Sequence, residues 1–190
     1  APLVRRPVTV EKERLYTEIG VRSFYRGTFH RRTLPGSEFT WQNLFGIREG
    51  DLVFSNLMAW EQAIAVARRE DTGCVGNHRM LTCEADRTRA VPGFLFFYFQ
   101  QPDGFAQVLA ASPGSIARNK TLGPTQLAAM RVPLPSLDAQ RGFDALQAKV
   151  QEALAAQAAA SAELEKLLPA LLHETFGAEA APEAPARAAA

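Results

Sequence analysis

The stretch that decides the architecture is Val132-Pro133-Leu134-Pro135-Ser136-Leu137-Asp138-Ala139-Gln140-Arg141, which closes a mixed segment and opens a long alanine-rich one. Proline lacks a backbone N–H, and it disfavours helical backbone in the residue before it. The two prolines therefore predict an extended strap, and Asp138 is expected to cap a helix that starts directly after it. The strap divides the chain into a head, residues 1–136, a helix, residues 137–176, and a tail, residues 177–190.

The predicted helix carries a heptad pattern, because apolar residues recur at alternating intervals of three and four. We expect this seam to form a dimer or partner interface through Phe143, Leu146, Val150, Leu154, Leu164, Leu167 and Leu171. The middle of the seam holds Ala153, Gln157 and Ala160, which are too small or too polar to stabilise a lone helix in water. Two arrangements are open: the helix lies against its own head, or it pairs with another long helix. We favour pairing, because both ends of the seam carry Leu or Phe.

Two further features concern the end of the chain. Pro169 is expected to kink or end the helix, because proline removes a helical hydrogen bond. Residues 178–190 consist of Ala, Pro, Glu and a single Arg, a composition that indicates a disordered tail.

Charge is distributed unevenly between the predicted parts. The whole chain has a net charge of +1, but the head holds 17 Lys and Arg against 12 Asp and Glu, whereas residues 137–190 hold 4 against 8. A basic head on an acidic helix suggests a polyanionic partner for the head. Arginine greatly outnumbers lysine in the head, and its guanidinium suits bidentate contacts with phosphates and guanine edges.

Cysteine usage and hydropathy indicate the compartment and bear on metal binding. Two cysteines, Cys74 and Cys83, provide no disulfide framework, which fits a reducing cytoplasm. No apolar run reaches transmembrane length and the N-terminus lacks a signal sequence, so we expect a cytoplasmic protein without a membrane partner. The two cysteines and His78 place three possible zinc ligands within ten residues. We nevertheless expect no metal site, because buried strand cysteines beside a polar loop explain the spacing more simply.

Alternating and continuous apolar runs predict a head of short strands and helices. The expected strands cover residues 8–10, 16–25, 52–55, 63–67, 74–75 and 80–83, with a turn at 34–37. The expected helices cover residues 94–101, 104–111 and 125–130, and residues 39–45 form a short helix or an irregular segment. The predicted fold class is therefore α+β, a mixed domain of short strands followed by a long coiled-coil helix.

Motifs of several enzyme classes are missing from the sequence. It contains no G-x-S-x-G elbow, no P-loop and no G-x-G-x-x-G, and no acidic residue lies two positions before a lysine, as many nucleases require. The Asn-Pro-Pro-aromatic and Asp-Pro-Pro-aromatic motifs of amino-methyltransferases are also missing. Together these absences favour a binding protein with no catalytic residues and no cofactor of its own.

Three polar loops, residues 22–32, 76–79 and 114–121, carry side chains that suit DNA. Arginine and serine can hold phosphates, while asparagine and arginine match adenine and guanine edges. The candidate DNA-binding residues are Arg22, Ser23, Tyr25, Arg26, His30, Arg31, Arg32, Asn56, Asn77, His78, Arg79, Ser115, Arg118, Asn119 and Lys120. For each loop, an ordinary solvated hairpin or turn is the alternative interpretation.

The order of motifs along the chain resembles one half of a type I restriction–modification specificity subunit. The resemblance covers about Pro7 to Phe176. Its motifs are Gly-Val-Arg-Ser-Phe at 20–24, Gly-Asp-Leu-Val-Phe-Ser at 50–55, Ala-Trp-Glu at 59–61, Gly-Ser at 114–115, and the Pro-Leu-Pro strap before Gln140-Arg141.

The resemblance implies that the head is a target-recognition domain and that the helix is a spacer. In that family, two heads each read half of a split DNA sequence, and two antiparallel spacers fix their distance and dock methyltransferase subunits. The implied partners are double-stranded DNA, an adenine methyltransferase subunit that would bind S-adenosylmethionine, and a restriction subunit. A second copy of this chain, or another specificity domain, would supply the other half. The implied location is the cytoplasm of a bacterium or archaeon, on DNA.

The chain departs from the family pattern in three ways. It has one head, Ala139 stands where the family usually has Glu, and Gly142 weakens the first helical turns by about 1 kcal/mol relative to alanine. A second hypothesis is a protein-interaction factor that occupies methyltransferase subunits without reading DNA. A metalloenzyme that uses Cys74, His78 and Cys83 is the least favoured.

Overall fold

The computed structural model describes residues 1–39, 43–114 and 120–177, and strand β5 (Leu52–Ser55) is an inner strand of one of its sheets. Leu52 and Phe54 belong to one buried apolar cluster, and Val53 belongs to another. Side chains alternate between the two faces of a strand, so a continuous apolar run suits a strand that is covered on both faces. The strand predicted at residues 52–55 is confirmed.

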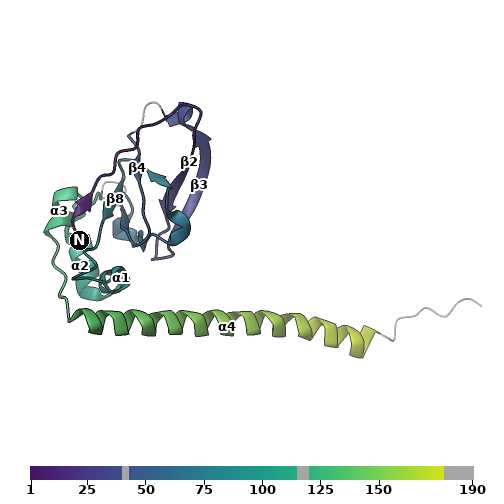
Figure 1. Ribbon diagram of the computed structural model, residues 1–190. Coiled ribbons are helices and arrows are strands. Elements are labelled where there is room, and N and C mark those ends of the chain that lie inside the picture. Colours follow the sequence, from purple (N-terminus) through teal and green to yellow (C-terminus); the bar gives the residue numbers. More distant parts are fainter. Residues whose placement is uncertain (40–42, 115–119, 178–190) are drawn as a thin grey trace, which may run out of the picture. The chain divides into compact units, whose positions relative to one another are not determined.

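The chain divides into two compact units, Ala1–Asp144 and Ala145–Ala190. Unit 1 therefore contains the predicted head, the strap and the first two turns of the helix that follows. The strands of unit 1 form two four-stranded sheets (Figure 1). The first has the order β1-β8-β5-β6 and is antiparallel, with β1 at Leu3–Val4, β6 at Ile64–Val66 and β8 at Met80–Cys83.

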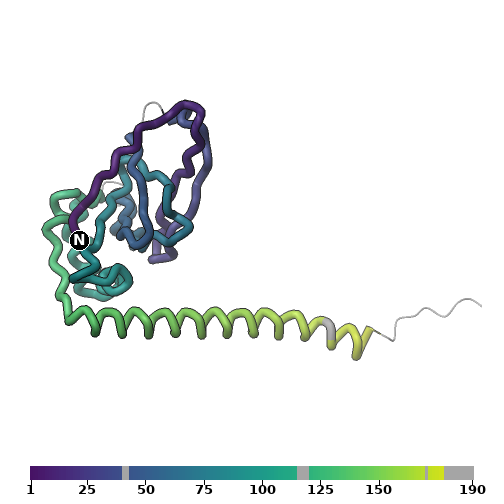
Figure 2. The backbone as a smooth tube through the Cα atoms, in the orientation of Figure 1, coloured from purple at the N-terminus to yellow at the C-terminus, as the bar shows by residue number. Residues whose placement is uncertain are grey.

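The second sheet has the order β3-β2-β7-β4, in which β2 and β7 are parallel. Its strands are β2 at Leu15–Val21, β3 at Thr28–Pro35, β4 at Phe45–Gly46 and β7 at Val75–Gly76. The N-terminal segment runs along both sheets (Figure 2), because β1 pairs with β8 and Pro7 forms a bridge with Phe45.

Three α-helices of unit 1 begin at prolines. They are α1 (Pro92–Gln100), α2 (Pro102–Ala110) and α3 (Pro124–Ala129), and the short 3-10 helices are η1 (Gly36–Phe39), η2 (Ala59–Glu61) and η3 (Arg69–Asp71). Proline suits the first helical turn, where its missing N–H would have no helical partner. The three α-helices predicted from the sequence are confirmed, with starts one or two residues earlier. Their apolar residues join Leu52 and Phe54 in the largest core cluster.

Three predictions for the first 40 residues are wrong in detail. Val8 and Val10 form no strand, although both pack against the core beside Tyr16. The strand predicted at 16–25 ends at Val21, because the chain turns sharply at Phe24 and Tyr25. The turn predicted at 34–37 overlaps the end of β3, an edge strand in which a proline is tolerated. Part of the segment 39–45 lies outside the described residues.

Helix α4 (Leu137–Phe176) has the predicted length, but its start and its proline differ from expectation. The Ser136 hydroxyl oxygen accepts the Ala139 N–H at 3.3 Å, so Ser136 caps the helix and Asp138 lies within its first turn. The helix continues through Pro169, so the prediction that Pro169 could end it is wrong. A proline removes one hydrogen bond, and the leucines and alanine around it favour helix strongly. None of the helices in the described part of the chain is long and apolar enough to cross a membrane.

Candidate DNA-binding surface

A bulge in the β2–β3 hairpin places two consecutive arginines on one face. Glu18 pairs with Arg32 and Ile19 pairs with His30, so Arg31 is the extra residue. Neighbouring residues of a regular strand point to opposite faces, and a bulge breaks this alternation. As a result, Arg31 contacts one oxygen of the Glu18 carboxylate at 3.3 Å, and Arg32 contacts the other at 3.0 Å.

Glu18 is 2% exposed and links the hairpin to the loop between β7 and β8. Its Oε1 accepts a hydrogen bond from the Asn77 side-chain amide at 3.4 Å. The Asn77 Oδ1 in turn accepts the backbone N–H of Arg79 at 2.9 Å, and the Arg79 carbonyl accepts the backbone N–H of Asn56 at 2.9 Å. The backbone of Arg79 is therefore held on both sides, while its side chain is exposed.

These residues border a hollow of about 370 Å³. Its walls are Glu18, Ile19, Gly20, Val21, Phe29, Arg31, Ser55, Leu57, Met58, Asn77, Arg79 and Met80. Gly20 leaves room for the Phe29 ring, since a Cβ at residue 20 would lie 2.6 Å from that ring. The lining of the hollow combines the guanidinium groups of Arg31 and Arg79 and the amide of Asn77 with apolar side chains, a combination that can bind the edge and the face of a base.

Two further cations lie beside the hollow. Each contacts an aromatic ring that lines the hollow or is hydrogen-bonded to a lining residue. The Arg22 guanidinium lies 4.8 Å from the centre of the Phe29 ring and donates to the Thr28 carbonyl at 2.6 Å. On another side, Lys120 Nζ lies 5.3 Å from the Trp60 ring. The indole N–H of Trp60 donates to the Leu57 carbonyl, and Leu57 lines the hollow. The surface formed by Arg22, Arg31, Arg32, Arg79, Lys120, Asn77 and Glu18 is called the hollow surface below.

At the tip of the hairpin, two of the three residues predicted to bind DNA make contacts within the protein instead. The Tyr25 hydroxyl donates to the Phe99 carbonyl at 2.6 Å, and its ring makes edge contacts with Phe96 and Phe105. Burial raises the pKa of Tyr25 to about 12. Ser23 donates to a Glu61 carboxylate oxygen at 3.2 Å, so both hydroxyls are engaged within the protein. Arg26 is exposed at the tip.

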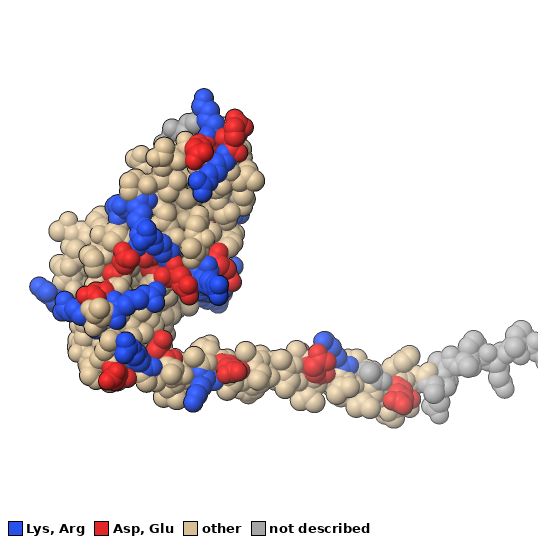
Figure 3. All heavy atoms as spheres, in the orientation of Figure 1, with Lys and Arg blue, Asp and Glu red and all other residues tan. Residues whose placement is uncertain are grey.

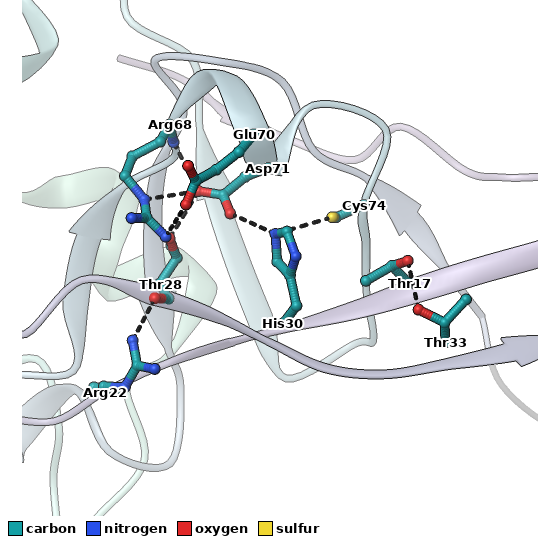
Figure 4. Close-up of polar contacts among 9 residues, drawn as sticks. All are labelled: Thr17, Arg22, Thr28, His30, Thr33, Arg68, Glu70, Asp71 and Cys74. Carbon is teal, nitrogen blue, oxygen red and sulfur yellow. Dashed lines mark hydrogen bonds and ion pairs between the residues drawn. The ribbon is translucent and has the colours of Figure 1, made fainter.

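His30 points toward Asp71 and Cys74 (Figure 4), whereas Arg31 contacts Glu18. The His30 Nε2 lies 3.0 Å from Oδ1 of Asp71, a carboxylate that also accepts the Thr28 hydroxyl at 2.7 Å and the Arg68 backbone N–H at 2.7 Å. Burial alone would raise the pKa of Asp71, but the hydrogen bonds from Arg68, Thr28 and His30 outweigh it and hold the pKa below its usual value. His30 therefore supports this buried carboxylate and does not border the hollow.

The cysteines do not gather with His78. Cys74 lies in the cluster around Val53, with its sulfur 3.6 Å from His30 Nε2, whereas Cys83 lies in the cluster around Leu52. Burial raises the pKa of both thiols, that of Cys83 to about 11, so they remain protonated at neutral pH and are poor nucleophiles. Within residues 1–39, 43–114 and 120–177, no group of three or more His, Cys, Asp or Glu could hold a metal ion.

The remaining predicted positions divide into placed and unplaced ones. His78 is exposed, and its carbonyl accepts a hydrogen bond from Arg5 at 3.4 Å. The backbone of Asn56 makes two hydrogen bonds: its N–H donates to the Arg79 carbonyl, and its carbonyl accepts the Leu122 N–H. Ser115, Arg118 and Asn119 lie outside the described residues.

The basic charge of unit 1 does not form a single patch on the face shown in Figure 3, where Lys and Arg lie intermixed with Asp and Glu. Arg6 illustrates why, because it makes two hydrogen bonds with Asp51, at 2.6 and 3.0 Å, and a further ion pair with Glu84 at 2.9 Å. Part of the excess positive charge that the sequence suggested is therefore used inside the fold.

Of the residues predicted to form a partner interface, Phe143 packs within unit 1 and the others are exposed. The Phe143 ring lies 6.0 Å from that of Phe94 and 4.5 Å from that of Phe97, so it packs on α1 within unit 1. The other predicted seam residues are 48–66% exposed: Leu146, Val150, Leu154, Leu164, Leu167 and Leu171. Unit 2 thus presents an apolar stripe along α4.

Two residues in or near the hollow surface, Glu18 and Phe24, are not among the residues predicted from the sequence. Glu18 is the acidic residue that orders Arg31, Arg32 and Asn77, and it is recognisable only once the strand register is known. Phe24 is 62% exposed at the hairpin tip, between two arginines. Its signal was present in the sequence, as an aromatic residue between cations next to a flexible glycine.

Comparison with known proteins gives structural matches alone: no family model and no curated protein sequence matches the chain. The HsdS subunit from Thermoanaerobacter tengcongensis aligns with a TM-score of 0.65 and 23% identity, over 97% of this chain and 49% of that one. A chain from a type I restriction–modification system, whose structure concerns complex assembly and conformational transition, aligns with a TM-score of 0.63 and 20% identity, over 96% of this chain and 51% of that one. This chain therefore has the α+β fold of HsdS specificity subunits and spans about half the length of the solved structures it matches.

Proposed function

We propose that this chain is a DNA-reading half of a type I restriction–modification specificity subunit, without catalytic activity of its own. The observation that carries the proposal is the hollow surface, on which Glu18 and Asn77 order three arginines around a concavity. The shared fold supports it. Preorganised arginine and asparagine side chains beside a hollow match the edges of DNA bases better than they match an apolar or acidic protein surface.

The side chains of the hollow surface divide into two roles. Arg31 and Arg32 share the Glu18 carboxylate, so their remaining donors suit phosphates, which require charge and position more than sequence. Arg79 has a fixed backbone and an exposed side chain, which suits bidentate contact with a guanine edge. Arg22 and Lys120, beside aromatic rings at the edges, extend the phosphate-binding surface.

The proposed partners follow from the exposed stripe of α4 and from the half-length match. A second copy of this chain, or another specificity domain, would pair with the stripe and supply the second reader. The pair would direct an adenine methyltransferase that binds S-adenosylmethionine, together with a restriction subunit, to a split sequence on cytoplasmic DNA in a bacterium or archaeon.

The test is a gel-shift titration of the full chain, with and without its methyltransferase subunits, on duplexes that carry the sequence methylated in cells. With four to five phosphate contacts, log K should fall with log salt at a slope of about −4. Arg79→Ala should lower the preference for the cognate duplex roughly 10- to 100-fold. The matched control is Arg69→Ala in η3, an exposed arginine outside the hollow surface, which should bind like the wild type. A binding constant that does not change with salt concentration would contradict the proposal.

A protein-interaction factor that occupies methyltransferase subunits without reading DNA is the second candidate, and the exposed stripe of α4 favours it equally. Charge reversal at Arg22 and Arg26 discriminates between the two. Under the first proposal it abolishes DNA affinity and leaves assembly with the methyltransferase intact. Under the second, the wild-type complex shows no preference for any duplex in the first place.

A further inference from the structure

The turn at the tip of the β2–β3 hairpin holds two bulky residues in a conformation that usually requires glycine or asparagine. Phe24 and Tyr25 have φ angles of 60° and 54°. Residues 22–27 connect the two strands, and consecutive aromatic residues with left-handed backbone inside this connection are strained. Strain of this kind persists only where the surrounding structure enforces it, and it concentrates at functional sites.

The surrounding structure holds this turn from several directions. The Phe24 N–H donates to the Glu61 carbonyl at 3.0 Å, and the Tyr25 N–H donates to the Gln62 carbonyl at 2.9 Å. The Tyr25 hydroxyl reaches the Phe99 carbonyl at 2.6 Å. Tyr25 therefore anchors the turn in the core, and the hydrogen bonds to the end of η2 fix its orientation.

Fixing Tyr25 inward turns Phe24 outward. Phe24 is 62% exposed, although burial of such a ring would stabilise the fold. The Arg26 guanidinium lies 5.7 Å from the centre of the Phe24 ring. Arg22, directly after β2, stacks on Phe29, which lines the hollow. The tip thus presents an exposed aromatic ring on a backbone held by hydrogen bonds, with a cation before it and a cation after it, next to the hollow surface.

We propose that Phe24 is a wedge that stacks on DNA bases and opens a base step beside the sequence read at the hollow. The inference rests on the proposed function and adds to it a mode of DNA deformation. A lone aromatic ring between cations fits the apolar faces of bases between phosphates. A protein partner would call for a broader apolar patch around the ring. The strained turn keeps the ring projecting before DNA arrives, so little freedom is lost on binding.

The test uses the full chain with its methyltransferase subunits and a duplex of the methylated sequence, in which 2-aminopurine replaces successive adenines. Wild-type binding should raise 2-aminopurine fluorescence at one step, because the probe brightens when it unstacks. Phe24→Ala should abolish this rise and weaken binding about tenfold. The salt slope should stay unchanged, because no phosphate contact is lost. Arg26→Ala is the contrasting variant and should lower the salt slope by about one.

Phe24→Asn separates DNA binding from folding. Asparagine tolerates positive φ, so this variant should melt at the same temperature as the wild type or higher, while it loses the fluorescence rise. A rise that persists in both Phe24 variants, or a wild-type complex that binds its site without unstacking a base, would overturn the wedge and leave DNA reading intact. A wild-type complex that binds no duplex would overturn the proposed function, and the wedge with it.

Discussion

Gln140 joins the start of helix α4 to the rest of unit 1, and replacing it with leucine gives a sharp test of how this contact is held. Its side chain is fully buried, at 0% exposure. The side-chain oxygen accepts the Val91 N–H at 3.0 Å, and the side-chain nitrogen donates to the carbonyls of Arg89 at 3.1 Å and Pro135 at 2.9 Å. One amide therefore satisfies three backbone groups, from the loop before α1, the start of α1 and the strap.

Leucine has nearly the same volume as glutamine but leaves all three backbone groups without this partner. Each unsatisfied buried group costs about 1–3 kcal/mol, and these groups are only partly buried, so the low end applies. We expect Gln140→Leu to lower the free energy of unfolding by about 3 kcal/mol. Gln140→Glu keeps one acceptor but turns a carboxylate toward two carbonyl oxygens, so its loss should be at least as large at neutral pH and smaller in acid.

The assay is urea unfolding of the full chain, followed by a probe of unit 1 such as tryptophan fluorescence. Gln151→Leu, on the exposed part of α4, is the matched control and should change the free energy of unfolding by less than about 0.5 kcal/mol. A loss below about 1 kcal/mol for Gln140→Leu would refute the reasoning, because water would then replace the amide at little cost.

Three further predictions concern the hollow surface, the buried carboxylate and α4. Glu18→Gln keeps the shape of the side chain but removes the charge shared by two arginines, so it should lower the free energy of unfolding by about 2 kcal/mol and reduce the preference for the cognate duplex in competition binding. The pKa of Asp71 is lowered in the folded protein, so its carboxylate stabilises the fold above its unfolded pKa of about 4. This stabilisation is lost as the pH falls through the folded pKa. The urea midpoint should therefore fall more steeply below about pH 4 in the wild type than in Asp71→Asn. An equal acid response of the two proteins would contradict the assignment. Leu164→Glu with Leu171→Glu should leave the unfolding of unit 1 unchanged and convert a dimer to a monomer in light scattering; a strict monomer of the wild type at high concentration would exclude self-pairing.

Local signals in the sequence account for much of the fold. The strap and the long helix follow from two prolines and a heptad pattern, and helices α1 to α3 follow from a proline before each apolar run. The continuous apolar run at 52–55 identifies a strand covered on both faces. These features depend on residues close together in the chain, which is why pattern and propensity suffice to predict them.

The candidate site could be predicted only as a set of residues. Arg31, Asn77 and Arg79 were expected in two separate loops, and the structure brings them together around one hollow. Tyr25 and Phe143 carry the residue types of a binding surface, yet each packs against its own unit. A tyrosine in a polar loop has the same local signature whether its hydroxyl meets a ligand or a backbone carbonyl from a distant helix.

By itself, the sequence determined the elements of this protein: a basic head of short strands, a proline strap and a long helix with an apolar stripe. The tertiary structure alone decided which side chains share a face. The bulge after Glu18 brings Arg31 and Arg32 to one carboxylate and leaves His30 on the other side. Side chains alternate with a period of two, so a shift of one residue in register exchanges the faces, and strand register is set by pairing across the sheet.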